Sequence, residues 1–198
     1  MKIGIFGGTF NPPHKGHLRL IEAFADKLEL NKVLVIPDKR PVHKICEDLA
    51  LDSDRAELCR RTFTGKNYEV STMVFTVNEI LSKYKDAQLF LVIGSDMFLS
   101  FHKWYKYREI MKKCTLCVMS REDEDTVKAL RSYAFSTLHI YMPSNEANGI
   151  IISPSSPLEI SSTEIRQKIS AGEDVSDVLT KEAYEFIKER GMYGYAKK

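Results

Sequence analysis

Short, continuous apolar runs are the feature of this sequence that most restricts its fold. Four such runs, rich in valine, isoleucine and leucine, lie at residues 3–6, 33–36, 89–93 and 116–119. Because their apolar residues do not alternate with polar ones, the runs predict strands that are buried on both faces. Residues 138–142 and 150–152 are further strand candidates.

Segments with helical spacing separate these runs. Apolar side chains repeat at helical spacing between positions 18 and 28, and residues 55–63 and 77–84 show a weaker form of the same pattern. Alternation of strands with helices is typical of a parallel sheet that carries helices on both faces. The sequence therefore predicts an α/β fold with a doubly wound parallel sheet.

The C-terminal part of the chain has a different pattern. Residues 161–169 and 181–189 indicate two helices, with Gly172 between them and Gly191 after the second, where glycine commonly ends a helix. A length of 198 residues suits one domain with a substantial core. We expect residues 1–198 to form a single domain, with residues 161–198 as a small helical subregion.

Composition argues against several classes of protein. The net charge is only +2 and no basic stripe dominates, which disfavours a nucleic-acid binder. No window of about 18 apolar residues is present, so we expect no membrane span. The chain runs from Met1 directly into a strand and a glycine-rich turn, so we expect no signal peptide and a cytoplasmic location.

The four cysteines are expected to be reduced thiols. Cys114 and Cys117 form a C-x-x-C pair, but the chain has no second pair to complete a structural zinc site. A site built from His43, Cys46 and Cys59 has no better support. The C-x-x-C pair lies in a run that predicts a buried strand, so we interpret Cys114 and Cys117 as part of the core.

A glycine-rich turn with two histidines follows the first predicted strand. Gly7 and Gly8 allow a sharp turn and a close approach to a ligand, and Thr9 adds a hydroxyl. We expect a helix to start near Lys15, whose free N–H groups and positive dipole end favour phosphate. His14 and His17 are three residues apart, which places both rings on one face of a helix start.

Two imidazoles at a helix start can stabilise negative charge on a transferring phosphoryl group, which needs positioning and electrostatics more than a protein nucleophile. The segment is neither a P-loop nor a G-x-G-x-x-G turn, and it lacks the H-E-x-x-H spacing of helical zinc sites. One alternative stays open at this stage. Taken singly, the histidines are compatible with one core and one surface residue of no chemical function.

A second candidate segment begins the helix predicted at residues 161–169. Ser161 and Glu164 fit a capping box, which alone would explain both residues. The same helix start would present Ser162 and Thr163 to a phosphate, with Arg166 one turn further on. Two helix starts of this kind can bind one triphosphate.

The two segments, Gly8-Thr-Phe-Asn-Pro-Pro-His-Lys-Gly-His17 and Ile160-Ser-Ser-Thr-Glu-Ile-Arg166, resemble the two signatures of the H-x-G-H nucleotidyltransferase superfamily. Within it the chain resembles the bacterial nicotinate-nucleotide adenylyltransferase family over residues 3–193. Residues 37–44 resemble its P-N-x-x-P-P-H-K stretch, residues 93–104 its I-G-x-D segment ending in Trp, and residues 189–193 its closing G-L-Y.

The resemblance implies a Rossmann-like nucleotidyltransferase fold and direct transfer of AMP from ATP to nicotinate mononucleotide. It implies catalytic roles for His14, His17 and Arg166. Those three would also bind ATP, together with Gly7, Gly8, Thr9, Phe10, Gly94, Asp96, Ser162 and Thr163. The acceptor would meet Lys44, Ser71, Asp96 and Trp104. Mg2+ would be bound through the ATP phosphates and not by protein side chains; no nucleic acid or membrane is implied as a partner, and a homo-oligomer is compatible with the sequence.

The chain departs from the family pattern at a few positions. Asn11 stands where the family often has Asp, and Val42 replaces a proline. Thr72 and Met73 follow Ser71 where the family usually has Tyr and Thr near the acceptor, which leaves the choice between nicotinate and nicotinamide mononucleotide open. A superfamily member acting on another phosphorylated metabolite, such as phosphopantetheine, and a non-catalytic nucleotide sensor are the alternatives.

Two of the implied residues have simpler readings in the sequence. Asp96 follows an apolar strand, where an acidic residue often caps a helix. Trp104 is compatible with a core position, although its neighbours Lys103 and Tyr105 predict partial exposure.

Overall fold

The computed structural model describes residues 1–38, 48–65, 67–71, 77–120, 123–154 and 161–195. The chain divides into two compact units. The first unit comprises Met1–Phe6, Phe24–Lys32 and Phe75–Pro157, and the second comprises Gly7–Ala23, Val33–Val74 and Leu158–Lys198. Each unit is described by itself.

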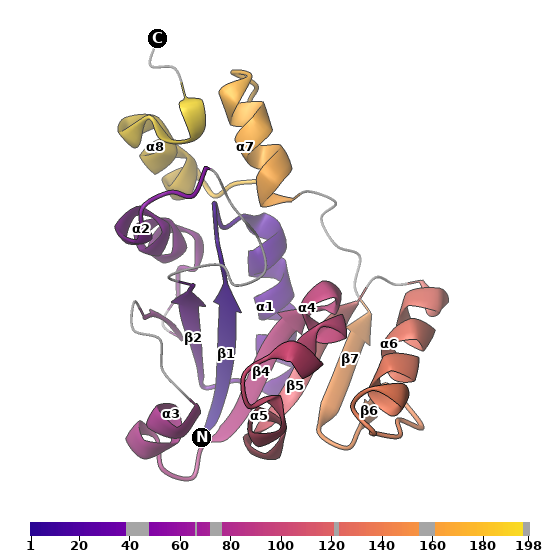
Figure 1. The fold of residues 1–198 in the computed structure, drawn as a ribbon. Coiled ribbons are helices and arrows are strands. Elements are labelled where there is room, and N and C mark those ends of the chain that lie inside the picture. The colour runs from indigo at the N-terminus through magenta and orange to yellow at the C-terminus, as the bar shows by residue number, and fades with distance from the viewer. Residues whose placement is uncertain (39–47, 66, 72–76, 121–122, 155–160, 196–198) are drawn as a thin grey trace. The chain divides into compact units, whose positions relative to one another are not determined.

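The strands of the described residues form one sheet in the order β3-β2-β1-β4-β5-β7-β6 (Figure 1). They are β1 (Lys2–Gly8), β2 (Lys32–Pro37), β3 (Tyr68–Val70), β4 (Gln88–Gly94), β5 (Cys114–Ser120), β6 (Glu146–Ala147) and β7 (Ile150–Pro154). The β1–β4, β4–β5, β5–β7 and β2–β3 pairs are parallel, whereas β6 pairs antiparallel with β7. The order reverses at β1, as in doubly wound sheets, and the α/β prediction is confirmed.

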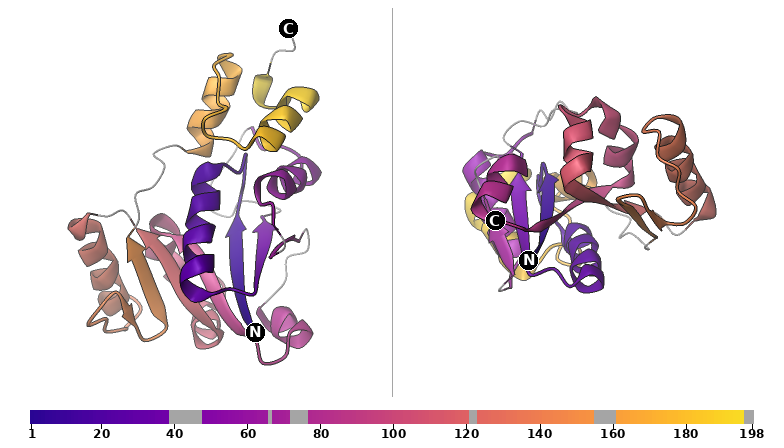
Figure 2. Two further views of the ribbon diagram at one scale, coloured as in Figure 1. Left: turned by 180° about the vertical axis from the view of Figure 1, so that it is seen from behind. Right: turned by 90° about the horizontal axis from the view of Figure 1, so that it is seen from below.

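The helices of the described residues alternate with these strands. They are α1 (Lys15–Leu28), α2 (Asp52–Thr62), α3 (Val77–Lys83), α4 (Ser95–Leu99), α5 (Tyr107–Lys113), α6 (Glu124–Ser136), α7 (Ser162–Ser170) and α8 (Lys181–Arg190), with short 3-10 helices η1 (Phe101–Lys103) and η2 (Met192–Gly194). In the first unit, α6 lies alongside β7 in the views of Figures 1 and 2. Among the described residues, no helix is long and apolar enough to span a membrane.

Burial explains why the apolar runs form strands. Val33, Leu34 and Val35 in β2 are essentially inaccessible to solvent, as are Val92 in β4 and Cys117 in β5. Consecutive residues of a strand point to opposite faces, so burial of neighbours along β2 requires cover on both faces. The five strands predicted at residues 3–6, 33–36, 89–93, 116–119 and 150–152 are confirmed.

The strand predicted at residues 138–142 is wrong. This segment closes the end of α6 instead, because the N–H groups of Leu138 and Ile140 donate to the carbonyls of Tyr133 and Ala134. Its apolar character still serves the core, since Leu138 and Met142 are buried.

The two C-terminal helices are confirmed, and their ends follow from local chemistry. Ser161 and Glu164 form a reciprocal capping box at the start of α7, and the Thr180 hydroxyl caps α8. Gly191 ends α8 with a φ of 61°, a conformation that glycine adopts without strain. Both helices contribute to one apolar cluster of the second unit, which includes Ile165, Ile169 and Ile187 and the α2 residue Leu58.

The C-x-x-C pair belongs to the core, as interpreted from the sequence. Cys114 and Cys117 are buried in β5, and burial raises the pKa of both thiols to about 12. A thiol that stays protonated at neutral pH is a poor nucleophile and a poor metal ligand. The alternative cluster with His43 and Cys46 lies outside the described residues.

Candidate functional site

The turn between β1 and α1 is shaped by the ring of Phe10. This side chain is 2 % exposed and contacts His17 and Phe63 edge-on, with centroids 5.2 Å and 5.7 Å away. A Cβ at Gly8 would lie 3.1 Å from the Phe10 ring, so a side chain here would have to displace the ring by a few tenths of an ångström. The Phe10 ring therefore belongs to the core.

His14 and His17 lie against each other, as their spacing predicts. Their ring centroids are 3.8 Å apart, and α1 begins between them at Lys15. The Nδ1 of His14 accepts the N–H of Gly16 at 3.1 Å, and the Nδ1 of His17 accepts the N–H of His14 at 3.3 Å. A ring nitrogen that accepts a hydrogen bond carries no proton, so each neutral ring carries its proton on Nε2. His14 is buried and His17 is partly buried, so neither ring is fully exposed to solvent.

The two rings are uncharged at neutral pH. Burial lowers the pKa of His14 to about 4. Burial, and then the neighbouring His14, holds the pKa of His17 well below its ordinary value. The histidines therefore act as N–H donors in the free protein, and an anion bound beside them would raise their pKa.

The start of α7 is bonded to the same turn. The Ser162 hydroxyl donates to the carbonyl of Pro12 at 2.8 Å, and Nη1 of Arg166 donates to the carbonyl of Asn11 at 2.9 Å. These bonds connect residues about 150 positions apart in the sequence, within the second unit. They bring the two predicted phosphate-binding segments together, and Thr163 lies exposed beside them in the first turn of α7.

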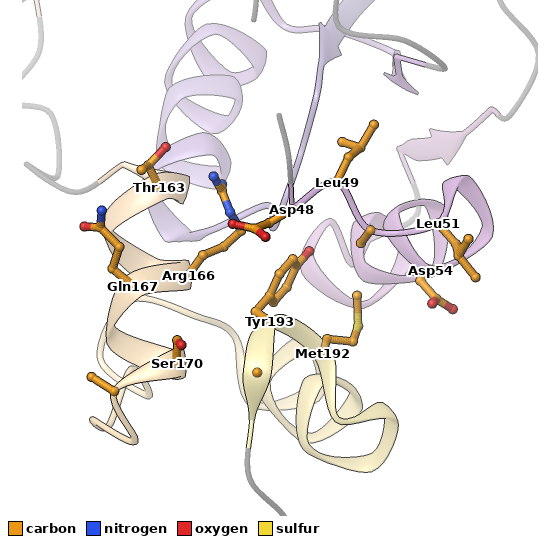
Figure 3. Close-up of a pocket in the computed structure, with 13 residues that line it drawn as sticks. Asp48, Leu49, Leu51, Asp54, Thr163, Arg166, Gln167, Ser170, Met192 and Tyr193 are labelled. Carbon is orange, nitrogen blue, oxygen red and sulfur yellow. The ribbon is translucent and has the colours of Figure 1, made fainter. Parts of the chain in front are cut away.

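A pocket of about 840 Å³ opens along α7, as Figure 3 shows. Asp48, Arg166 and Tyr193 lie together in one part of it, with Met192 beside Tyr193 and Ser170 further along α7. This volume is within the range of small-molecule sites. Nε of Arg166 is buried and has no hydrogen-bond partner among the residues that the structure describes. An unpaired buried donor of this kind is a candidate contact for a ligand.

In the first unit, Gly94 ends β4 and precedes Asp96 in the first turn of α4. A Cβ at Gly94 would lie 2.9 Å from Oδ1 of Asp96, so only glycine leaves this carboxylate in place. Gly94 itself is the N-cap residue and no side chain caps the helix, so the reading of Asp96 as a cap is wrong.

Trp104 is half-buried, as its neighbours predict. Its ring contacts Phe101 with centroids 5.2 Å apart, and Phe101 also contacts Tyr107. The indole N–H is buried without a hydrogen-bond partner in the described part of the chain. A buried donor that lacks a partner is a candidate contact for a ligand.

The remaining predicted site residues divide into described and masked positions. Ser71 is buried at the end of β3, where its N–H donates to the carbonyl of Val35 at 2.9 Å. Lys44, Val42, Thr72 and Met73 lie outside the described residues. Among the residues that the structure describes, no group of three or more His, Cys, Asp or Glu side chains could hold a metal ion.

Three residues of this region were missed by the sequence reasoning as functional candidates: Asn11, Arg55 and Tyr193. Asn11 is 2 % exposed, and its Oδ1 accepts the N–H of Ala50 at 3.1 Å and the hydroxyl of Tyr193 at 2.9 Å. Arg55 is fully buried. For Arg55, the sequence feature that could have been used is a charged residue on the buried side of a helix. No local sequence feature indicates the contacts of Asn11 and Tyr193.

Comparisons with known proteins agree on one family. The sequence profile of the family described as Cytidylyltransferase-like matches residues 5–168. A relative from Neisseria meningitidis serogroup B, "Probable nicotinate-nucleotide adenylyltransferase", is 32% identical over 203 residues, which cover 97% of this chain and 98% of the relative. A relative of the same name from Listeria monocytogenes serotype 4b is 30% identical over 204 residues, which cover 98% and 97%.

A solved structure has the same fold. The nicotinic acid mononucleotide adenylyltransferase of Plasmodium falciparum, complexed with NaAD, aligns with a TM-score of 0.68. The alignment covers 98% of each chain at 14% sequence identity. At this identity the likeness establishes the fold.

Proposed function

Because the chain belongs to the cytidylyltransferase-like nucleotidyltransferases, and within them to the nicotinate-nucleotide adenylyltransferase family, we propose that it transfers AMP from ATP to nicotinate mononucleotide. The products are deamido-NAD and pyrophosphate. The observation that supports this most is the bonding of α7 to the histidine turn, through Ser162 with Pro12 and Arg166 with Asn11. This bonding puts two helix starts and two imidazole donors within one unit.

The reaction is a direct displacement. An oxygen of the acceptor phosphate bonds to the α-phosphorus of ATP as the bond from that phosphorus to the bridging oxygen breaks, and pyrophosphate leaves with the electron pair. The Nε2–H groups of His14 and His17 donate to phosphate oxygens as negative charge develops. Arg166 and the N–H groups at the start of α7 act from the other segment. Positioning and charge stabilisation of this kind suffice for phosphoryl chemistry.

Magnesium enters this proposal as part of the substrate MgATP. The described residues that would face the phosphates carry imidazole, hydroxyl and guanidinium groups and not the carboxylates that commonly bind magnesium in proteins. Phosphate oxygens and water would therefore coordinate the ion. It would neutralise charge on the triphosphate.

The acceptor contacts are proposed residue by residue. The Asp96 carboxylate would accept hydrogen bonds from ribose hydroxyls. The backbone around Trp104 would recognise the nicotinate carboxylate, with the indole near the ring. Lys44 and Ser71 are proposed as further acceptor contacts from the family resemblance alone. We further propose that residues 1–198 work as one nucleotidyltransferase domain in the cytoplasm, with residues 161–198 as its helical subregion.

Pyrophosphate release with MgATP tests the function. Nicotinate mononucleotide, nicotinamide mononucleotide and phosphopantetheine are compared as acceptors at equal concentration. We expect the highest kcat/KM with nicotinate mononucleotide. Equal use of both mononucleotides would contradict the acid preference, and release with phosphopantetheine alone would contradict the proposed acceptor.

A further inference from the structure

Arg55 is a buried arginine whose hydrogen bonds reach several separate segments of the second unit. Its Nη1 donates to the carbonyl of Thr9 at 2.6 Å, and its Nη2 donates to the carbonyl of Asp38 at 2.6 Å. Nε donates to the carbonyl of Ala50 at 3.2 Å, and Nη2 also meets Oδ1 of Asp52 at 2.7 Å. The side chain is 0 % exposed.

A charge in this position is costly unless it is fully hydrogen-bonded. Asp52, the carboxylate bonded to Arg55, is itself 60% exposed. Backbone carbonyls of Thr9, Asp38 and Ala50 supply the remaining contacts. The planar guanidinium directs its donors in a fixed fork, which the single ammonium of lysine cannot reproduce. The burial of Arg55 therefore depends on how these three carbonyls are placed relative to one another.

Each bonded carbonyl adjoins the nucleotide-binding turn. Thr9 is part of that turn, and the N–H of Asp38, just past β2, donates to the carbonyl of Gly8 at 2.9 Å. Ala50 is held from its other side, because its N–H donates to Oδ1 of Asn11.

The bonds continue from Asn11 to α7. The carbonyl of Asn11 accepts from Arg166, so a continuous series of hydrogen bonds runs from Arg55 through Ala50 and Asn11 to Arg166. Arg55 therefore fixes the position of Ala50, at one end of this series, and also that of the Thr9 backbone.

We propose that Arg55 is a positioning residue for the transfer reaction, which fixes the backbone of the nucleotide-binding turn against the end of β2 and the start of α2. The inference rests on the proposed function. Arg55 does not reach the solvent and acts on substrate through Thr9 and Asn11. Loss of the guanidinium hydrogen bonds would displace the turn that holds the α-phosphorus in line with the acceptor. The rate of transfer should therefore fall more than the affinity for ATP.

The variant Arg55→Lys tests this at 25 °C, with kcat expressed per folded molecule. Arg131→Lys is the matched control, because Nε and Nη2 of Arg131 also donate to a backbone carbonyl, that of Met142, in the first unit. We expect Arg55→Lys to lower kcat at least 10-fold with the KM for ATP changed less than 3-fold. Arg131→Lys should lower the Tm and leave kcat unchanged.

An unchanged kcat in folded Arg55→Lys would overturn the proposal and leave Arg55 a purely structural residue. Asp52→Asn decides the matter if Arg55→Lys does not fold, because Asp52 is exposed enough to be replaced without opening the core. We expect kcat to fall 2- to 5-fold in Asp52→Asn, and an unchanged kcat there would also overturn the proposal. These assays use whichever acceptor the wild-type protein turns over. If that acceptor is not nicotinate mononucleotide, the proposed function is contradicted, but the test of Arg55 still holds.

Discussion

The rings of His14 and His17 lie with centroids 3.8 Å apart at the start of α1, and backbone N–H groups occupy the Nδ1 atom of each ring. This arrangement determines which atom of each imidazole carries a proton. It also determines what a substitution should remove. Asparagine can keep the acceptor at the position of Nδ1, whereas it has no counterpart of Nε2.

His17→Asn is therefore expected to lower kcat by roughly 10²- to 10³-fold, the usual loss when one donor to a developing charge is removed. The hydrogen bond from the His14 N–H can be retained, so the Tm should change little. His139→Asn is the matched control, since His139 is exposed in the first unit and has a φ of 60° that asparagine tolerates. Steady-state pyrophosphate release measures both variants. Full activity of His17→Asn would contradict the role assigned to Nε2.

The free energy of unfolding should fall as the pH drops from about 6.5 to about 4. His14 binds a proton near its ordinary pKa of 6.5 when unfolded, but only near 4 when folded, so the unfolded chain binds more protons between these values. The loss from His14 approaches about 3 kcal/mol at the acid end. Urea unfolding at pH 7.5 and 4.5 measures it, and His14→Asn should show a smaller loss than wild type. An identical pH dependence in the two proteins would contradict burial as the cause.

Arg166→Lys should weaken the use of ATP. Lysine cannot both bond the Asn11 carbonyl and present the donor that Nε of Arg166 leaves unpaired. We expect kcat/KM for ATP to fall roughly 10- to 100-fold, in line with loss of a charged hydrogen bond. Arg190→Lys is the control, because the Arg190 side chain is 53% exposed and lysine can keep its ion pair with Asp54. Equal kcat/KM for ATP in the two variants would contradict a role for Arg166 in ATP binding.

Gly94→Ala should disturb the acceptor contacts without unfolding the protein. The new Cβ would lie 2.9 Å from Oδ1 of Asp96 and push this carboxylate aside. We expect the KM for the acceptor to rise about 10-fold or more, with a smaller change in the KM for ATP. Asp96→Asn should reproduce the effect on the acceptor. An unchanged KM for the acceptor in both variants would exclude Asp96 from acceptor binding.

The fold was predictable where apolar runs carry it. Consecutive burial along β2 leaves a continuous pattern that sequence reasoning detects. The strands β3 and β6, with three and two residues, are too short to show any period, and α5 has no buried residue. The run at residues 138–142 looks like a strand because it is apolar, but its N–H groups are used by the end of α6.

The site was predictable where its chemistry is local. Spacing alone placed His14 beside His17, and the capping box at Ser161 marked the start of α7. Contacts between distant residues were not predictable, because no local pattern encodes them. Arg55 reaches Thr9 across 46 positions, and Tyr193 reaches Asn11 across 182.

Transfer of the α-phosphate of ATP is the step on which every role above depends, and labelled ATP follows it directly. Wild-type protein is incubated with MgATP labelled at the α-phosphorus and with nicotinate mononucleotide, and the products are separated. The label should appear in deamido-NAD, in a molar amount equal to the pyrophosphate released. Label found in AMP or ADP, with none in a dinucleotide, would contradict nucleotidyl transfer by this chain.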